Sequence, residues 1–206
     1  MPESLRSYLD FAIETAYLAG RLTLGYFQTD IRPDFKADDS PVTIADKRAE
    51  ELIRARIEKQ FPQHAIVGEE FGLKETVGAT HRWIIDPIDG TKAFSRGVPL
   101  YGVLLGLEIE GKVQVGVAYA PAMNDLVAAA TGEGCWWNGR RAHVSNVATL
   151  SRATIAHTNQ PALPNIIAPP NGNVCNAPRI TSPDGAICTD TSSSPPDAPN
   201  SCSIQL

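Results

Sequence analysis

The first 60 residues carry apolar side chains with the period of an α-helix. They recur every three or four positions from residue 5 to about residue 26, and Ser4 stands where its hydroxyl can cap the first turn. A second apolar stripe covers residues 45–57, with charged side chains on the opposite face, and ends before Pro62. The spacing therefore predicts two amphipathic helices near the N-terminus.

From residue 65 onward the apolar residues form short runs that are typical of β-strands. Two longer β-rich runs are joined by Glu110-Gly111-Lys112, which indicates a hairpin, and Asn138-Gly139 marks another tight turn. Two helices followed by a series of strands predict an α+β fold, with the N-terminal helices packed on one side of an antiparallel sheet. The predicted strands cover residues 65–67, 83–85, 101–109, 113–119 and 126–131.

The composition changes near residue 160. All aromatic residues lie before that point, and Arg179 is the only basic residue after it. The last segment is rich in proline and serine, holds three of the four cysteines and has neither a helix nor a strand period. We therefore expect a folded domain over residues 1–155. Residues 156–206 are expected to be a natural disordered tail or an aberrant C-terminus that replaces a folded segment.

The bulk composition disfavours several classes of protein. The formal net charge of −5 argues against nucleic acid as the main partner, because a phosphate-binding surface normally has an excess of basic residues. No apolar run approaches the roughly 20 residues that span a bilayer, and the N-terminus lacks a signal-peptide pattern. We expect a soluble, cytoplasmic protein without a membrane partner. The cysteines show no Cys-x-x-Cys spacing, so neither a zinc site nor a disulfide framework is supported.

The most informative motif is Asp86-Pro87-Ile88-Asp89-Gly90-Thr91. Its two carboxylates follow a predicted strand, and a proline restricts the backbone between them, so both can converge on a hard cation together with the Ile88 carbonyl. Oxygen ligands without a nearby cysteine or histidine favour Mg²⁺ or Mn²⁺ over zinc. The backbone amides of Gly90 and Thr91 suit the start of a helix aimed at a phosphate. Taken alone, such a motif is more often an acidic turn.

Two further acidic residues add to this motif. Glu69 follows the strand predicted at residues 65–67, and Asp46 lies in the first turn of the second predicted helix. Singly, Glu69 is more often a solvated loop residue and Asp46 more often a residue that favours the helix dipole. Together with Asp86 and Asp89 they supply four carboxylates for one site, and bound metal ions would offset the repulsion among them.

These motifs, in this order, resemble the inositol monophosphatase family over about residues 5–155. The family comprises inositol monophosphatases, histidinol phosphatases and fructose bisphosphatases, which are Mg²⁺-dependent and often lithium-sensitive hydrolases of phosphoric monoesters. The resemblance implies a layered α/β sandwich in which residues 1–155 form the metal-binding half, and residues 92–102 lean toward the histidinol phosphatase branch. The motifs that carry it are Lys36…Asp39-Ser40-Pro41-Val42-Thr43…Asp46, Gly68-Glu69-Glu70, Trp83-Ile84-Ile85 with the hexapeptide after it, and Gly132-Glu133-Gly134…Asn138-Gly139.

The resemblance implies a metal centre built from four of these residues. Glu69, Asp86 and the Ile88 carbonyl would bind a first metal ion, and Asp86 and Asp89 would reach a second. The centre would hold two or three Mg²⁺ ions, which Mn²⁺ can replace.

The resemblance also implies the catalytic set of Asp46, Glu69 and Thr91. Thr91, hydrogen-bonded to Asp46, would orient or deprotonate the attacking water, and the substrate phosphate would lie against the amides of Gly90 and Thr91. Lys36 is either an electrostatic neighbour of the site or a surface lysine. The implied substrate-binding residues are Glu69, Ile88, Asp89, Gly90 and Thr91.

The resemblance fails where family members continue with a second α/β segment that carries a Trp-Asp-x-Ala motif, which is missing here. Three hypotheses therefore stay open. The first is a Mg²⁺-dependent phosphomonoesterase acting on L-histidinol phosphate, in histidine biosynthesis, with inositol 1-phosphate and fructose 1,6-bisphosphate as alternative substrates. The second is an inactive remnant that binds metal or phosphate without turnover, and the third is a metal-independent interaction module with a proline-rich tail. Family members are commonly dimers, which implies a homodimer.

Overall fold

The computed structural model describes residues 4–37, 40–149 and 152. The chain divides into two compact units, Met1–Ala142 and His143–Leu206. All helices and strands given below lie in the first unit. The predicted tail, residues 156–206, lies outside the described residues.

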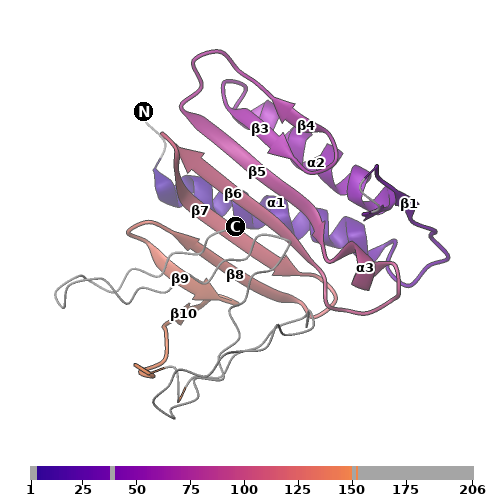
Figure 1. Cartoon of the computed structure of the whole chain (residues 1–206). Helices are drawn as coiled ribbons and strands as arrows, with labels where there is room; N and C mark the ends of the chain where they lie inside the picture. Colours follow the sequence, from indigo (N-terminus) through magenta and orange to yellow (C-terminus); the bar gives the residue numbers. More distant parts are fainter. Residues whose placement is uncertain (1–3, 38–39, 150–151, 153–206) are drawn as a thin grey trace, which may run out of the picture. The chain divides into compact units, whose positions relative to one another are not determined.

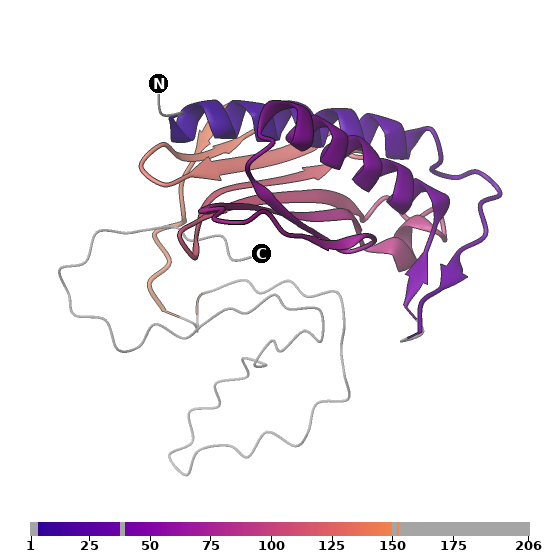
Figure 2. The same ribbon diagram turned by 90° about the horizontal axis from the view of Figure 1, so that it is seen from above.

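Two helices pack on one face of a sheet, as the apolar stripes predict (Figures 1 and 2). α1 (Leu5–Leu24) is capped by Ser4, whose side chain accepts a hydrogen bond from the Ser7 amide, and it ends slightly before the predicted residue 26. α2 (Ile44–Gln60) starts with a capping box. The Thr43 side chain accepts a hydrogen bond from the Asp46 amide, and the Asp46 carboxylate accepts one from the Thr43 amide. Within the described ranges, neither these helices nor any other is long and apolar enough to cross a bilayer.

The second layer is an eight-stranded sheet with the order β10-β9-β8-β7-β6-β5-β3-β4. A separate two-stranded ribbon, β1-β2, precedes α2, and a short helix, α3, follows β5. The elements are β1 (Asp34–Phe35), β2 (Pro41–Val42), β3 (Ala65–Gly68), β4 (Gly72–Lys74), β5 (His81–Asp89), α3 (Thr91–Phe94), β6 (Gly102–Ile109), β7 (Lys112–Ala120), β8 (Asp125–Ala130), β9 (Gly134–Trp137) and β10 (Arg140–Ala142).

The sheet is mixed, which corrects the expectation of a wholly antiparallel sheet. β3 and β5 run parallel, with Gly68 opposite Ile85, whereas the other neighbouring strands are antiparallel. The reason is the path of the chain. It leaves β3 through the edge strand β4 and returns to start β5 on the other side of β3, so β3 and β5 point the same way and end at the same edge.

The predicted strands and the hairpin are confirmed, including the short strand β3, whereas five other short strands are not predicted. Glu110 and Gly111 adopt positive φ in the turn between β6 and β7. β5 extends well beyond the predicted residues 83–85, and its pairing with β6 shifts register between Asp86 and Asp89. The sequence analysis does not predict β1, β2, β4, β9 and β10, because runs of two to four residues show too little periodicity.

The core lies between the helices and the sheet. Leu9 of α1 and Ile53 of α2 are almost completely buried there, and Trp83 of β5 stacks on Phe61 at the end of α2. A second, smaller cluster joins the start of α2 to the end of β5 and to α3, and its buried members are Ala45, Ile88, Phe94 and Tyr101. This second cluster brings the first turn of α2 next to the acidic motif.

Gly20 provides a test of the packing between α1 and the sheet. An added Cβ would come within 2.5 Å of the buried Tyr119 ring. We predict that Gly20→Ala lowers the free energy of unfolding by about 1–3 kcal/mol through overpacking, although the same change inside an exposed helix raises it by about 1 kcal/mol. Urea denaturation followed by circular dichroism measures the change.

Arg21→Ala is the control, because Arg21 is exposed on the same helical turn. It should change the free energy of unfolding by no more than about 0.5 kcal/mol. A Gly20→Ala variant more stable than the wild type would contradict the close packing of α1 on Tyr119.

Candidate metal and phosphate site

The parallel pair of β3 and β5 brings two acidic segments to one edge of the sheet. Gly68 pairs with Ile85, so the residues that follow them, Glu69 just after β3 and Asp86 on β5, lie side by side. The Glu69 amide continues the ladder by donating to the Ile85 carbonyl at 3.2 Å. β5 then leads directly into α3 (Figure 1). Ligands of α/β sheets commonly bind outside such carboxyl ends of parallel strands.

Asp86 is a half-buried carboxylate, and one of its oxygens is fully buried without a partner among the described residues. Burial and then the neighbouring charges of Glu69 and Asp89 raise the pKa of Asp86 from an ordinary 3.8 to about 8. Its Oδ1 atom is buried and accepts no hydrogen bond from the described residues. A buried carboxylate oxygen in this state is unfavourable unless a proton or a cation neutralises it. Asp86 therefore has the properties of a ligand for a hard cation.

The chain turns sharply between Asp86 and α3. The register shift in the pairing of β5 with β6 spans Asp86 to Asp89 and includes Pro87, and such a bulge re-aims the side chains around it. Gly90 then adopts a φ of 90°, and a Cβ there would lie 2.9 Å from the Leu100 carbonyl oxygen. Only glycine suits this position, which places α3 immediately after the acidic motif.

The Asp46 carboxylate connects the first turn of α2 to the start of α3. The Thr91 hydroxyl oxygen lies 3.1 Å from Asp46 Oδ1 and 3.0 Å from the Ile88 carbonyl oxygen. The amide and the hydroxyl of Thr43 donate to Asp46 Oδ2 at 2.8 and 2.6 Å. Burial raises the pKa of Asp46 above 3.8, and these hydrogen bonds oppose the rise. Thr91 is thus held between two acceptors and keeps lone pairs that can accept a hydrogen bond.

Lys36, directly after β1, holds two acidic side chains of the adjacent turn. Its Nζ lies 2.7 Å from Glu69 Oε1 and 2.9 Å from Glu70 Oε1. Burial by itself lowers the pKa of Lys36, but the hydrogen bonds and charges of the two glutamates outweigh this and raise it above 10.5. In the part of the chain that the structure describes, no group of three or more Asp, Glu, His or Cys side chains is arranged to hold a metal ion, and Lys36 already occupies Glu69. A cation bound at Glu69 would compete with the Lys36 ammonium group, because both would contact the same carboxylate.

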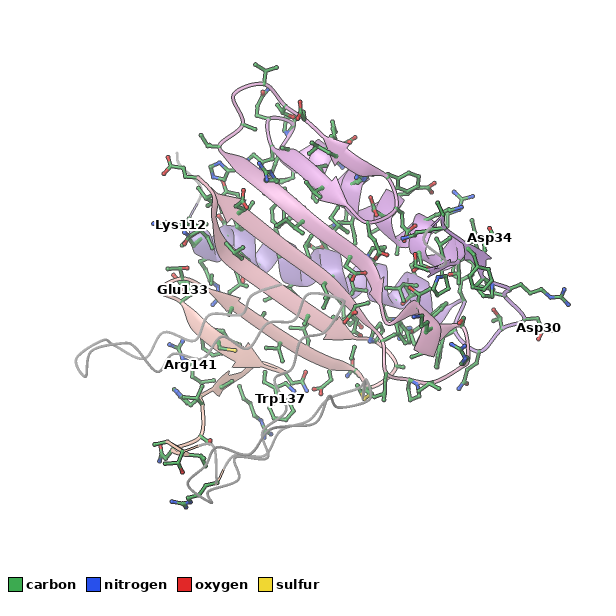
Figure 3. All side chains as sticks on the ribbon, in the orientation of Figure 1. Asp30, Asp34, Lys112, Glu133, Trp137 and Arg141 are labelled. Carbon is green, nitrogen blue, oxygen red and sulfur yellow. The ribbon has the colours of Figure 1, made fainter. Side chains whose placement is uncertain are left out.

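The residues predicted for the site come together around the end of β5. Figure 3 shows Lys112, Glu133 and Arg141 at the other end of the sheet from Asp34, which lies two residues before Lys36. The predicted residues found near one another are Asp46, Glu69, Asp86, Ile88, Asp89, Gly90 and Thr91.

The sequence analysis predicts no role for Thr43 or Glu50. Thr43 could be found from its spacing to Asp46, because a hydroxyl followed by an acid three residues later is typical of a capping box. Glu50 is completely buried. Its position in the sequence could have indicated a role, because Glu50 stands between Ala49 and Ile53 of the apolar stripe. A glutamate is almost never fully buried unless a partner compensates its charge.

Comparison with known proteins gives a consistent match. The model of the inositol monophosphatase family matches residues 4–179, which extends beyond the residues 5–155 that carry the recognised motifs. A histidinol-phosphatase from Chlorobaculum parvum is 44% identical over 173 residues, which are 84% of this chain and 65% of that protein. A Nus factor SuhB from Pasteurella multocida is 37% identical over 155 residues, which are 74% of this chain and 58% of that protein.

A solved structure shares the fold. The inositol monophosphatase from Anabaena (Nostoc) sp. PCC 7120 superimposes with a TM-score of 0.61 at 36% sequence identity, covering 71% of this chain and 53% of that one. The chain thus spans between about half and two thirds of the length of these three proteins.

The raised pKa of Asp86 predicts a pH-dependent loss of stability when divalent cations are removed by chelation. In the unfolded chain this carboxyl loses its proton near pH 3.8, but in the folded chain it keeps the proton up to about pH 8. The free energy of unfolding should therefore fall as the pH rises between these values. Asp86→Asn removes the ionisation, so its gain in Tm over the wild type should be larger at about pH 8 than at about pH 5.

Asp10→Asn is the matched control, because Asp10 is an exposed acid that pairs with Arg6 on α1. It should give the same small change of Tm at both pH values. A gain for Asp86→Asn that does not depend on pH would show that Asp86 is ionised normally in the folded chain.

Proposed function

The chain belongs to the inositol monophosphatase family, and on this premise we propose that it is a Mg²⁺-dependent phosphomonoesterase for a small polar phosphate. Members of the family are generally metal-dependent. The observation that carries the proposal is the buried Asp86 Oδ1 atom, which accepts no hydrogen bond from the described residues and lies among the charges of Glu69 and Asp89. Such an oxygen favours a cation over further protein contacts.

The proposed metal ligands are Glu69, Asp86, Asp89 and the Ile88 carbonyl. All of them are oxygen donors, which suit two or three Mg²⁺ ions, or Mn²⁺ in their place. Bound Mg²⁺ would supply positive charge to the phosphate oxygens and lower the pKa of a water molecule. Glu69 would release the Lys36 ammonium group in favour of the cation, since both compete for the same carboxylate.

Thr91 and Asp46 are proposed to handle the proton of the attacking water. The Thr91 hydroxyl oxygen would take a proton from that water while its own proton passes to Asp46 Oδ1, 3.1 Å away. Thr43 holds the other oxygen of Asp46 with two hydrogen bonds, which keeps Oδ1 turned to Thr91. The raised pKa of Asp46 makes the carboxylate a better proton acceptor. Glu69 is the further proposed member of the catalytic set.

The amides at the start of α3 are proposed to bind the phosphate. The first N–H groups of a helix have no partner within the helix, and the glycine conformation at Gly90 lets the main chain approach a ligand closely. The side chains of Glu69 and Asp89 and the carbonyl of Ile88 would complete the substrate contacts, together with Thr91.

We propose L-histidinol phosphate as the substrate. The support is the 44% identity to a histidinol-phosphatase, together with residues 92–102, which lean toward that branch of the family. The alternative is inositol 1-phosphate, because the Anabaena inositol monophosphatase is 36% identical and shares the fold.

Thr91→Ala tests the proposed proton transfer. Loss of the hydroxyl should lower kcat by about 10²–10⁴-fold, the usual range for general acid–base catalysis, with little change in KM. Thr91→Ser keeps the hydroxyl and should restore most of the activity. Ser95→Ala, at an exposed hydroxyl just after α3, is the control and should match the wild type. A wild-type kcat in Thr91→Ala would remove Thr91 from the mechanism.

Phosphate release from a panel of substrates tests the proposed activity. L-Histidinol phosphate, inositol 1-phosphate and fructose 1,6-bisphosphate are compared with and without Mg²⁺, with Asp86→Asn as the blank. We expect Mg²⁺-dependent release with the highest kcat/KM for L-histidinol phosphate. A preference for inositol 1-phosphate would overturn the substrate and keep the reaction. Release from none of them would overturn the phosphatase activity.

A further inference from the structure

Glu50 is a buried carboxylate for which the proposed chemistry has no use. It lies on α2 one helical turn after Asp46, and both residues are completely buried. Residues four positions apart share one face of a helix, so α2 presents both carboxylates to the same side. A buried charge persists only where other groups compensate it. The partners of Glu50 therefore define what it does.

Both oxygens of Glu50 are committed to hydrogen-bond donors. Oε2 accepts from the Glu70 amide at 2.7 Å, and Oε1 accepts from the Phe71 amide at 3.2 Å and from Arg54 Nε at 2.7 Å. Arg54 also donates to the Gly72 carbonyl. With three donors on its two oxygens, Glu50 is placed to hold backbone and not to bind a cation itself.

The backbone that Glu50 holds is the turn between β3 and β4. The Glu69 amide donates to the Ile85 carbonyl on β5, and the next two amides of the turn donate to Glu50. One side chain thus satisfies two successive backbone donors beside Glu69. Their orientation sets the direction of the turn and, with it, the position of the Glu69 side chain next to Asp86.

Gly68 is the matching half of this arrangement. A Cβ at Gly68 would lie 1.8 Å from Glu50 Oε1, so any other residue there would push the carboxylate away. Gly68 also pairs with Ile85, which fixes the end of β3 beside β5. The glycine and the glutamate are therefore required together for the turn to have this geometry.

We propose that Glu50 is a positioning residue, which orients the Glu69-Glu70 turn so that Glu69 can bind the metal ion together with Asp86. The inference rests on the proposed metal site. It adds a residue that touches neither metal nor substrate and acts only through backbone amides.

The test compares Glu50→Gln with Glu51→Gln. Both remove one negative charge from the same helix, but Glu51 is exposed and pairs with Arg48. In Glu50→Gln a side-chain NH₂ group replaces one acceptor oxygen and faces a donor. Isothermal titration calorimetry of the full chain with Mn²⁺ alone measures the affinity. Glu50→Gln should bind about 10- to 100-fold more weakly, as is typical when a residue supporting a metal ligand is lost. Glu51→Gln should bind as the wild type does.

Amide hydrogen exchange without metal separates local positioning from general destabilisation. In Glu50→Gln the amides of Glu70 and Phe71 should exchange faster, while those of Ile53 and Ile57 in α2 stay protected. Gly68→Ala provides a second variant that keeps both charges, and it should weaken Mn²⁺ binding and loosen the same two amides. It carries the test if Glu50→Gln does not fold.

Glu69→Gln distinguishes an error in the proposed metal site from an error in the positioning role of Glu50. If Glu69→Gln binds Mn²⁺ as tightly as the wild type, the proposed metal site is wrong and the positioning role is overturned with it. If Glu69→Gln weakens binding but Glu50→Gln and Gly68→Ala do not, only the positioning role is overturned. Weaker binding in all three variants, with local loss of protection in the latter two, supports both.

Discussion

Compensation of buried negative charge governs the end of the sheet where β3 and β5 stop. Asp46 is stabilised by hydrogen bonds from Thr43 and Thr91, and Glu50 by Arg54 and two backbone amides. Glu70 is paired with Lys36. Among these acids, Asp86 keeps a buried oxygen without a partner among the described residues, and burial together with the charges of Glu69 and Asp89 raises its pKa. This imbalance separates the candidate ligand from the supporting acids, since a structural carboxylate would be fully satisfied.

The same interactions that stabilise the fold also arrange the site. Asp46 closes the capping box of α2 and contacts Thr91, so the start of the helix and the start of α3 depend on one carboxylate. The cluster that contains Ile88 and Phe94 holds α3 against α2 from the apolar side. A change at Asp46 would therefore affect helix stability and the position of Thr91 together. Stability and activity have to be measured separately for such residues.

Much of the fold follows from local pattern. The two helices predicted from the apolar stripes are confirmed, because an amphipathic helix buries one face in any α+β arrangement. The hairpin of β6 and β7 is also local, since its turn residues stand between two long apolar runs. The parallel pairing of β3 with β5 is not local. It depends on the chain passing through the edge strand β4 and returning to the other side of β3. The spacing of residues along the sequence does not predict that path.

The candidate site divides in the same way between sequence and tertiary structure. The sequence by itself determined which acids are candidates for the site, because Asp86 and Asp89 stand within one motif whose backbone is restricted by proline and glycine. Only the tertiary structure decided which distant groups meet at this end of the sheet: Lys36 pairs with Glu69, and Glu50 accepts hydrogen bonds from backbone amides of the turn that follows β3. The physical reason is that charge compensation acts over a few ångströms in space, whatever the separation along the chain.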